Sequence, residues 1–124
     1  MSFFEVKLSG NPSFSVSRAI SNTLTRLNET YLRGVSTRMA VCIDYLDHSL
    51  WFVKGMSLAE VDQNMMSICM TIEQELAEDQ YAVFAQAVFH AFDDVIGDLH
   101  ELSSLRIVGP QTTRVHYKYS IEKA

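Results

Sequence analysis

The chain has 124 residues and a formal net charge of −5, from 10 lysines and arginines against 15 aspartates and glutamates. Its 48% hydrophobic and 20% charged residues are typical of a folded globular domain and argue against disorder. No run of about 18 apolar residues occurs, which excludes a membrane-spanning helix. Glu5 interrupts the apolar start where a signal peptide would continue, so we expect a cytoplasmic protein. The acidic total also disfavours nucleic-acid binding.

The first third of the chain predicts a strand followed by a helix. Apolar and polar side chains alternate over residues 2–8, which is the pattern of a half-buried strand. Gly10 and Pro12 then break the strand, and a serine within residues 13–17 can cap the helix that follows. Apolar residues recur at helical spacing up to Gly34, which is well placed to end that helix.

Residues 35–53 fit two interpretations. In the first, residues 37–45 alternate as a strand, residues 47–49 turn, and residues 50–53 return as a second strand, which makes a β-hairpin. In the second, the whole segment is a helix with apolar residues on every side. We favour the hairpin because the β-branched and aromatic residues of this segment suit a pleated surface.

A pair of helices is predicted next. Ser57 and Glu60 have the spacing of a capping box, and apolar residues at helical spacing predict a helix over residues 57–77. A second amphipathic helix extends from about residue 79 to residue 102. The polar connection between the two is short, which indicates an antiparallel pair. We refer to residues 57–104 as the acidic helical hairpin.

The last part of the chain predicts a second β-hairpin. Residues 105–108 and 114–121 alternate as strands on either side of a turn at Gly109 and Pro110. The predicted element order is therefore β-α-β-β-α-α-β-β. It indicates a single α+β domain over residues 1–124, with a mostly antiparallel sheet of about five strands and three helices on one face.

The charge is distributed unevenly along the chain. Between Lys54 and Arg106 there is no lysine or arginine, but ten of the 15 acidic residues lie there. A surface selected for helix stability would include basic residues at i, i+4 spacing. The missing bases therefore favour a surface that binds a partner, against the alternative of a solvated face that keeps the protein soluble.

The leading functional hypothesis is an acidic protein-binding module. No phosphate-binding loop, dinucleotide glycine motif or zinc-protease motif is present, so we expect no catalytic residues and no cofactor. An inhibitor, immunity protein or adaptor of this kind would occlude a basic site on a partner protein. A tryptophan on a predicted strand would add an apolar contact. The candidate partner-binding residues are Glu73, Glu75, Glu78, Asp79, Asp93, Asp94, Asp98, Glu101 and Trp51.

A metal site is a weaker hypothesis for the second predicted helix. His90, Asp94 and Asp98 are four residues apart, with Glu101 three residues further on, so these side chains share a helical face. Imidazole and carboxylate groups are ligands for several metal ions. The shared face lies opposite the apolar stripe, however, so we favour a solvated surface without a metal ion.

The carboxylates also allow an enzymatic interpretation. Glu75 and Glu78, followed by Asp94 and Asp98, resemble the ExxE…ExxD pattern of the all-α, magnesium-dependent nucleoside triphosphate pyrophosphatases, although the second pair is spaced by four residues rather than three. The resemblance implies a metal-dependent nucleotide hydrolase whose ions these four side chains hold. A third hypothesis is a structural homo-oligomer, such as a homodimer, that pairs through the outer sheet face or an edge strand.

Overall fold

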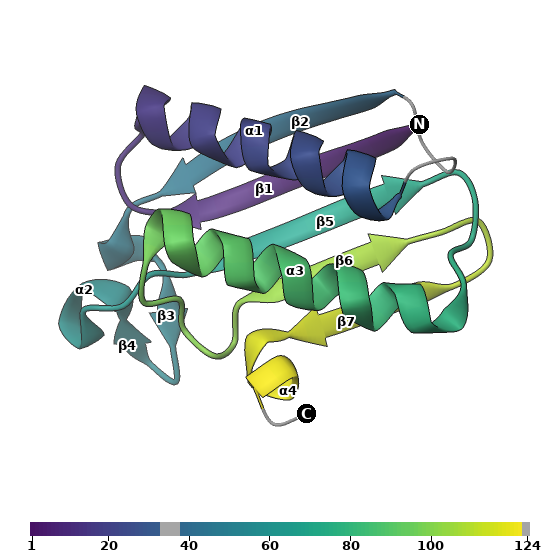
Figure 1. The fold of residues 1–124 in the computed structure, drawn as a ribbon. Helices are drawn as coiled ribbons and strands as arrows, with labels where there is room; N and C mark the ends of the chain where they lie inside the picture. Colours follow the sequence, from purple (N-terminus) through teal and green to yellow (C-terminus); the bar gives the residue numbers. More distant parts are fainter. Residues whose placement is uncertain (33–37, 123–124) are drawn as a thin grey trace.

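The structure, a computed structural model, describes residues 1–32 and 38–122. Its elements pack as one sheet with helices above it and a short protruding segment at one end (Figure 1). In chain order they are β1 (Ser2–Ser9), α1 (Phe14–Tyr31), β2 (Met39–Leu46), the 3₁₀ helix η1 (His48–Leu50), β3 (Phe52–Val53), β4 (Met56–Ser57), α2 (Leu58–Val61), β5 (Met66–Ile72), α3 (Glu78–Ile96), β6 (Ser104–Val108), β7 (Thr113–Tyr117) and α4 (Lys118–Glu122).

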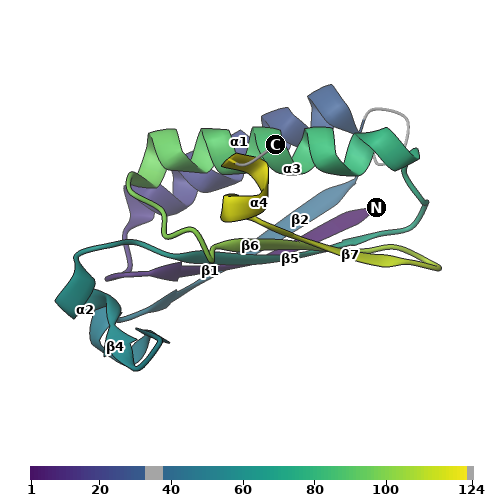
Figure 2. The same cartoon turned by 90° about the horizontal axis from the view of Figure 1, so that it is seen from below.

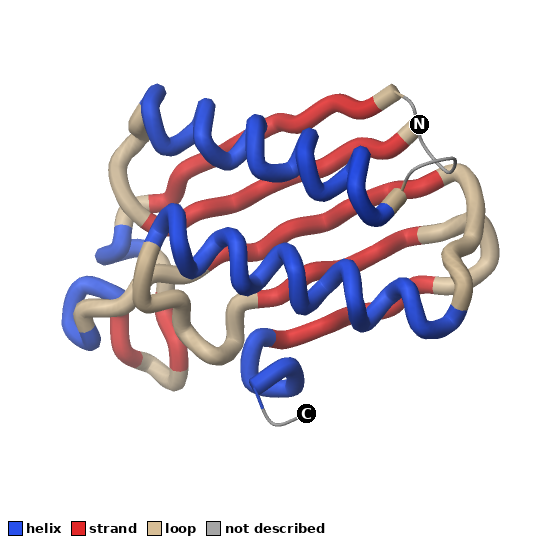
Figure 3. Tube along the Cα trace, viewed as in Figure 1, coloured by secondary structure: helices blue, strands red, loops and turns tan. Residues whose placement is uncertain are grey.

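The main sheet has five strands in the order β2-β1-β5-β6-β7 (Figure 3). β1 pairs with β2 in parallel and β5 pairs with β6 in parallel, while β1–β5 and β6–β7 are antiparallel. The sheet is therefore made of two β-α-β units, β1-α1-β2 and β5-α3-β6, joined in opposite directions, with β7 added at one edge. The prediction of an α+β fold with about five strands is confirmed, but the sheet is mixed rather than mostly antiparallel.

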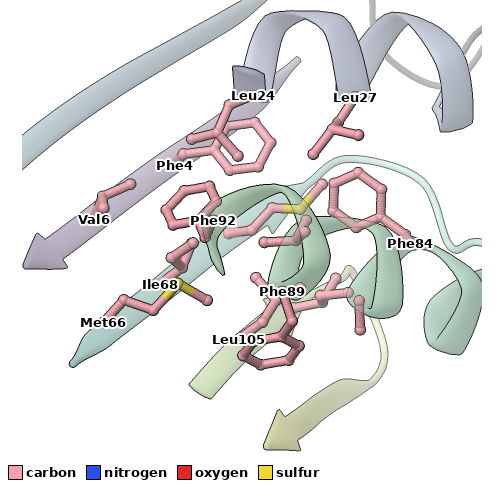
Figure 4. Packing of buried hydrophobic residues seen from close by; sticks show 14 of the residues in the cluster. Phe4, Val6, Leu24, Leu27, Met66, Ile68, Phe84, Phe89, Phe92 and Leu105 are labelled. Atoms are coloured by element: carbon pink, nitrogen blue, oxygen red, sulfur yellow. The ribbon is translucent and has the colours of Figure 1, made fainter. Parts of the chain in front are cut away.

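Both long helices cover the same face of the sheet. Figure 2 shows α1 and α3 side by side on one side of the strands; among the described elements, the segment with β4 and α2 extends to the opposite side at one end of the sheet. Side chains of alternate strand residues point toward the helices and are buried there, including Phe4 of β1 and Ile68 of β5. They pack against Leu24 of α1 and against Phe84 and Phe92 of α3 (Figure 4). This single apolar layer forms the core.

The predicted helix over residues 57–77 is wrong. Only Leu58–Val61 forms a helical turn, α2, in which the Glu60 carboxylate accepts a hydrogen bond from the Ser57 amide at 2.9 Å. Met66–Ile72 is instead the central strand β5, whose residues alternate between buried and more exposed. Apolar residues four positions apart share a face in a strand as well as in a helix, so the spacing that predicted a helix is compatible with both. The acidic helical hairpin consequently does not exist.

The predicted hairpin over residues 35–53 is right in strand type and wrong in pairing. Residues 33–37 lie outside the described part of the chain, but Met39–Leu46 is a strand. It pairs in parallel with β1 rather than with residues 50–53. β3 pairs with β4 across Lys54 and Gly55, which have φ of 52° and 80°. Positive φ at both central residues is what a tight two-residue hairpin turn requires.

The ends of the later elements also differ from prediction. The second predicted helix is confirmed as α3, but it ends at Ile96 because Gly97 takes a φ of 79°. The last predicted strand stops at Tyr117, where α4 begins. The described residues thus contain four α-helices rather than three. At the other end of the chain, β1 is confirmed and α1 begins after Ser13, whose hydroxyl accepts a hydrogen bond from the Val16 amide at 3.3 Å.

We predict that Phe92→Ala lowers the free energy of unfolding by about 3–5 kcal/mol, because Phe92 is fully buried between α3 and the sheet. Phe14→Ala is the matched control, since Phe14 is 79% exposed, and it should change the value by less than about 0.5 kcal/mol. Urea unfolding measures both. Equal effects of the two substitutions would contradict the assignment of the core.

Candidate functional site

Three residues with different chemical groups occupy neighbouring positions where β1 begins. In the strand register, Ser2 is opposite Met39 of β2 and Ile72 of β5, which places Met1 between Arg38 and Glu73. The α-amino group of Met1 lies 3.2 Å from the Glu73 carboxylate, and both side chains are more than half exposed. The backbone carbonyl of Arg38 accepts a hydrogen bond from the Ser2 amide at 2.8 Å. We call Met1, Arg38 and Glu73 the amine site.

The residue next to the amine is held in a fixed position by α1. Ser2 is completely buried, and its hydroxyl donates a hydrogen bond to the Asn28 side-chain carbonyl at 2.9 Å. Asn28 is itself only 3% exposed and lies in the last turn of α1, where its backbone carbonyl accepts the Leu32 amide. A buried hydrogen bond between polar side chains defines their positions, because leaving either unpaired is costly. The start of β1 is therefore positioned by α1 on one side and by β2 and β5 on the others.

Glu75, in the loop between β5 and α3, contacts two other parts of the chain at the same end of the sheet. Its carboxylate accepts hydrogen bonds from the Tyr81 hydroxyl at 2.6 Å, the Thr112 hydroxyl at 2.7 Å and the Gln111 amide at 2.7 Å. The Tyr81 hydrogen bond is the largest cause that lowers the pKa of Glu75, from 4.5 to about 2, and the bonds from Thr112 and Gln111 add to it. Glu75 is thus a connection between the start of α3 and the β6–β7 turn.

Arg114 continues this cluster along β7. Its guanidinium forms two hydrogen bonds to Glu78, at 2.6 and 2.8 Å, and lies 4.4 Å from the centre of the Tyr81 ring. The Glu78 carboxylate accordingly raises the pKa of Arg114. His116, two residues further along the strand, is half-buried, and burial lowers the pKa of its imidazole. These contacts fasten β7 beneath α3.

The acidic residues of the predicted binding surface are dispersed, and several are paired within the chain. Glu73, Glu75 and Glu78 have the partners described above, and Lys118 of α4 lies 3.2 Å from Asp93. The bases that are missing between residues 54 and 106 are thus supplied in space by β7 and α4. Of the other predicted residues, Trp51 is half-buried, and the exposed ones are Asp79, Asp94, Asp98 and Glu101.

The candidate metal ligands do not form a centre. Among the residues that the structure describes, no group of three or more His, Cys, Asp or Glu side chains could hold a metal ion, the set of His90, Asp94 and Asp98 included. Glu75 and Glu78 lie at the start of α3, and Asp94 and Asp98 lie at its end, so the two pairs of the pyrophosphatase-like pattern are separated by most of the length of a helix of 19 residues, which is roughly 28 Å long. In the described part of the chain, no helix is both long and apolar enough to cross a membrane.

A polar groove lies at the opposite end of the sheet. Two adjoining hollows of about 470 and 300 Å³ share Gln63 and Asp98 in their walls. In the smaller one, the Asn64 amide donates a hydrogen bond to the Gly97 carbonyl at 2.9 Å, so its oxygen accepts from His48 Nε2 at 3.0 Å. Because Asn64 fixes the orientation of the imidazole, the groove is a well-ordered surface.

Comparisons with known proteins identify the fold. No family model and no curated protein matches the sequence. Among solved structures, the chain is similar to a fused 4-OT described as a symmetric trimer, at 13% identity and a TM-score of 0.67, over 86% of this chain and 84% of that one. It is similar to MIF2 of Leishmania major, at 11% identity and a TM-score of 0.61, over 90% of this chain and 89% of that one. It is also similar to FG41 malonate semialdehyde decarboxylase inhibited by 3-bromopropiolate, at 11% identity and a TM-score of 0.61, over 89% and 82% of the two chains.

The chain therefore has the tautomerase/MIF-like fold. This result overturns the hypothesis of an acidic inhibitor, immunity protein or adaptor, because the structures that share the fold are tautomerase-like and MIF-like proteins. Sequence reasoning named Glu73 as a partner-binding candidate and pointed to neither Met1 nor Arg38, so it missed the amine site as a group. Met1, Arg38 and Glu73 are far apart in the sequence, and only the pairing of β1 with β2 and β5 brings them together.

We predict that Glu75→Gln lowers the melting temperature at neutral pH and that the difference from the unchanged chain shrinks as the pH falls from 4.5 to about 2. The folded-state pKa is the lower one, so the stabilisation by ionised Glu75 is present above the ordinary value and is lost as the folded protein takes up the proton. Thermal unfolding over this pH range measures the effect. Asp94→Asn is the control, because Asp94 is an exposed acid on α3; the prediction fails if both variants lose the same stability.

Proposed function

We propose that this protein is the subunit of a homo-oligomeric enzyme that moves a proton next to the carbonyl group of a small oxo acid. The fold likeness supports an enzyme of this kind, and malonate semialdehyde, which one of the similar proteins is named for, is a small oxo acid. The observation that carries the proposal is the amine site, where an α-amino group lies between an arginine and a glutamate at the start of β1. Because proteins that share one fold can have many different functions, the proposed reaction is inferred from the residues of the amine site.

The amine supplies the base. α-Amino groups exchange protons near neutral pH, whereas lysine side chains do so only in alkaline solution. The neutral amine of Met1 accepts a proton from the carbon beside the substrate carbonyl, the C–H electron pair becomes a C=C bond as the carbonyl π pair moves onto oxygen, and the ammonium then gives the proton to the enolate oxygen, which yields the enol. The reverse sequence converts the enol to the ketone, the C=C and C=O double bonds exchanging along with the C–H and O–H bonds, and no cofactor is needed. Glu73, at 3.2 Å, stabilises the ammonium form between the two steps.

Arg38 supplies the binding group for the substrate carboxylate. Its side chain is exposed, and its position in the register is next to Met1 on the side opposite Glu73. A guanidinium binds a carboxylate through two parallel hydrogen bonds, which orients the substrate as well as holding it. With the carboxylate on Arg38, the adjoining carbonyl and its α-carbon lie toward the amine. The order Arg38, Met1, Glu73 across three strands therefore separates binding, proton transfer and charge stabilisation.

The uncovered sheet face supports assembly into an oligomer. Helices cover one face only, and the other face carries exposed side chains from each of the five strands, including Cys42, Glu5, Thr71, Arg106 and Val115. Antiparallel sheets can expose one face to water, but such faces are usually polar, and this one mixes apolar and charged residues. The fused 4-OT that shares the fold is described as a symmetric trimer. We propose the same number of subunits for this protein.

We predict that the purified chain accelerates the conversion of the enol form of a small 2-oxo acid to its keto form, and that selective acetylation of the Met1 amine lowers kcat by about 10²–10⁴-fold. Acetylation removes the base and, with it, the ion pair to Glu73, and the Glu73→Gln variant measures the contribution of that ion pair separately. The loss of ultraviolet absorbance of the enol measures the rate.

The matched variants separate the roles of the other two residues. Arg38→Ala should raise KM more than it lowers kcat, because it removes a binding group, and Glu73→Gln should lower kcat more than it raises KM, because it removes the carboxylate beside the ammonium. Asp94→Asn, on the far end of α3, should leave both parameters unchanged. Full activity of the acetylated chain would overturn the role of the amine, and absence of any activity toward 2-oxo and 3-oxo acids would overturn the proposed reaction.

A further inference from the structure

Glu73 reaches the Met1 amine from a short loop. This loop, residues 73–77, runs from Ile72, the last residue of β5, to Glu78, the first residue of α3, and we call it the β5–α3 loop. The side chains of Glu73 and Met1 are 69% and 52% exposed. An ion pair between exposed groups is weak, because two mobile side chains must be held in one geometry. The contact therefore depends on how firmly the backbone of Glu73 is held.

The β5–α3 loop is anchored on both sides of Glu73. Ile72 is 3% exposed and is opposite Ser2 in the sheet. The Glu75 carboxylate accepts four hydrogen bonds. Between these two anchors lie only Glu73 and Gln74. A span of two residues between fixed ends has few alternative conformations, so the anchors determine where Glu73 lies.

The β6–β7 turn supplies three of the four hydrogen bonds to Glu75. The Gln111 and Thr112 amides donate to Oε1 at 2.7 and 3.1 Å, and the Thr112 hydroxyl donates to Oε2 at 2.7 Å. The fourth comes from the Tyr81 hydroxyl of α3, at 2.6 Å. The Gly109 amide closes the turn by donating to the Thr112 carbonyl at 2.8 Å. Successive backbone N–H groups in a turn form a concave surface that binds anions, and Glu75 is the anion that occupies this one.

The β6–β7 turn adjoins the amine site in the sheet. Thr71 of β5 is opposite Phe3 of β1 on one side and Val108 of β6 on the other. The segments that follow Thr71 and Val108, the β5–α3 loop and the turn at residues 109–112, therefore run side by side at the end of the sheet where the chain begins (Figure 1). The turn is next to this loop on the side away from β1.

A glycine in the turn makes room for the carboxylate. A Cβ atom at Gly109 would lie 2.7 Å from Glu75 Oε1 and 3.1 Å from its Cδ and Oε2 atoms. Since a carboxylate at the end of a flexible side chain can move, Gly109→Ala would displace Glu75 from the turn without disrupting the sheet. Glycine at this position thus allows the turn and the carboxylate to meet.

We propose that Glu75 is a positioning residue, which through its hydrogen bonds to the β6–β7 turn holds Glu73 beside the Met1 amine. Both carboxylate oxygens of Glu75 are engaged by the turn and by Tyr81, so it acts through the backbone of the two residues before it. The effect on catalysis rests on the proposed function, whereas the effect on the position of Glu73 does not.

The first test measures the contact between Met1 and Glu73 without reference to activity. A water-soluble carbodiimide condenses an amine with a neighbouring carboxylate, with loss of water to the carbodiimide, and mass spectrometry of a digest gives the yield of the Met1–Glu73 amide. Glu75→Ala and Gly109→Ala should lower this yield by about two- to fivefold, the factor that an exposed ion pair contributes to its own geometry. Asp79→Ala is the matched control, because Asp79 is an exposed acid in the first turn of α3, and it should keep the yield.

Variants of Thr112 keep this test decisive if Glu75→Ala does not fold. Thr112→Val removes one hydrogen bond to Glu75 at similar side-chain shape, and Thr112→Ser keeps the hydroxyl. The valine variant should give a lower yield of the amide, and the serine variant should give the yield of the unchanged chain. Unchanged yields in the Gly109→Ala and Thr112→Val variants would overturn the positioning role, as would an equal fall in the Asp79→Ala control.

Kinetics of the same variants connects the position of Glu73 with the proposed reaction. Glu75→Ala should lower kcat by about tenfold and keep KM within about twofold, because Arg38 is unchanged. Adding Glu75→Ala to Glu73→Gln should lower kcat no further than Glu73→Gln alone, since Glu75 acts through Glu73. Additive losses would overturn the positioning role. If the unchanged chain has no activity toward oxo acids, the proposed function fails, and the yield of the Met1–Glu73 amide still decides the role of Glu75.

Discussion

Burial of alternate side chains on β5 is the constraint on which the rest of the structure depends. Met66, Ile68, Met70 and Ile72 all point to the helix side and are at most 3% exposed, so β5 must lie in the middle of the sheet with a helix layer above it. β5 begins one of the two β-α-β units and pairs on its other side with β1 of the second unit, which runs in the opposite direction. The strands at the two edges of the sheet are β2 and β7. α1 and α3 cover one face of this sheet and leave the other face uncovered.

The same strand explains where sequence reasoning succeeded and where it failed. β1 and α3 could be predicted from the sequence. Their apolar residues recur every two and every 3.6 residues respectively, and over the length of each element the pattern fits only one of these two periods. On β5, Ile68 and Ile72 are four residues apart and satisfy both periods, and the capping pattern at Ser57 and Glu60 is real but begins a helix of only four residues. The local sequence pattern therefore identified the N-terminus of α2 correctly, but it did not predict that this helix is short and that the strand β5 follows it.

The candidate functional site could not be predicted from the sequence, for a related reason. Lys118 pairs with Asp93, and Arg114 with Glu78, so an acidic segment that appears unbalanced along the chain is partly balanced in space. Neither pairing could be predicted without knowing that β7 returns beneath α3. The amine site depends in the same way on strand order, because its three residues come from three different strands or their ends.

The two halves of the sheet have the same topology but differ at the positions where their first strands begin. β1 is preceded by Met1, whose amine faces Glu73. β5 is preceded by a loop whose polar groups are already used, since the Met65 amide donates to the Ser9 hydroxyl at 2.8 Å and the Met66 amide donates to the Ser103 hydroxyl at 3.2 Å. Because β1 and β5 are antiparallel, these starts lie at opposite ends of the sheet. The amine of the proposed function thus belongs to the β1 end, while at the β5 end the Met65–Ser9 bond joins the two halves and the Met66–Ser103 bond holds β5 to the residue before β6. The first half carries the amine where its strand begins and the second does not, so the repeated topology does not repeat the candidate site.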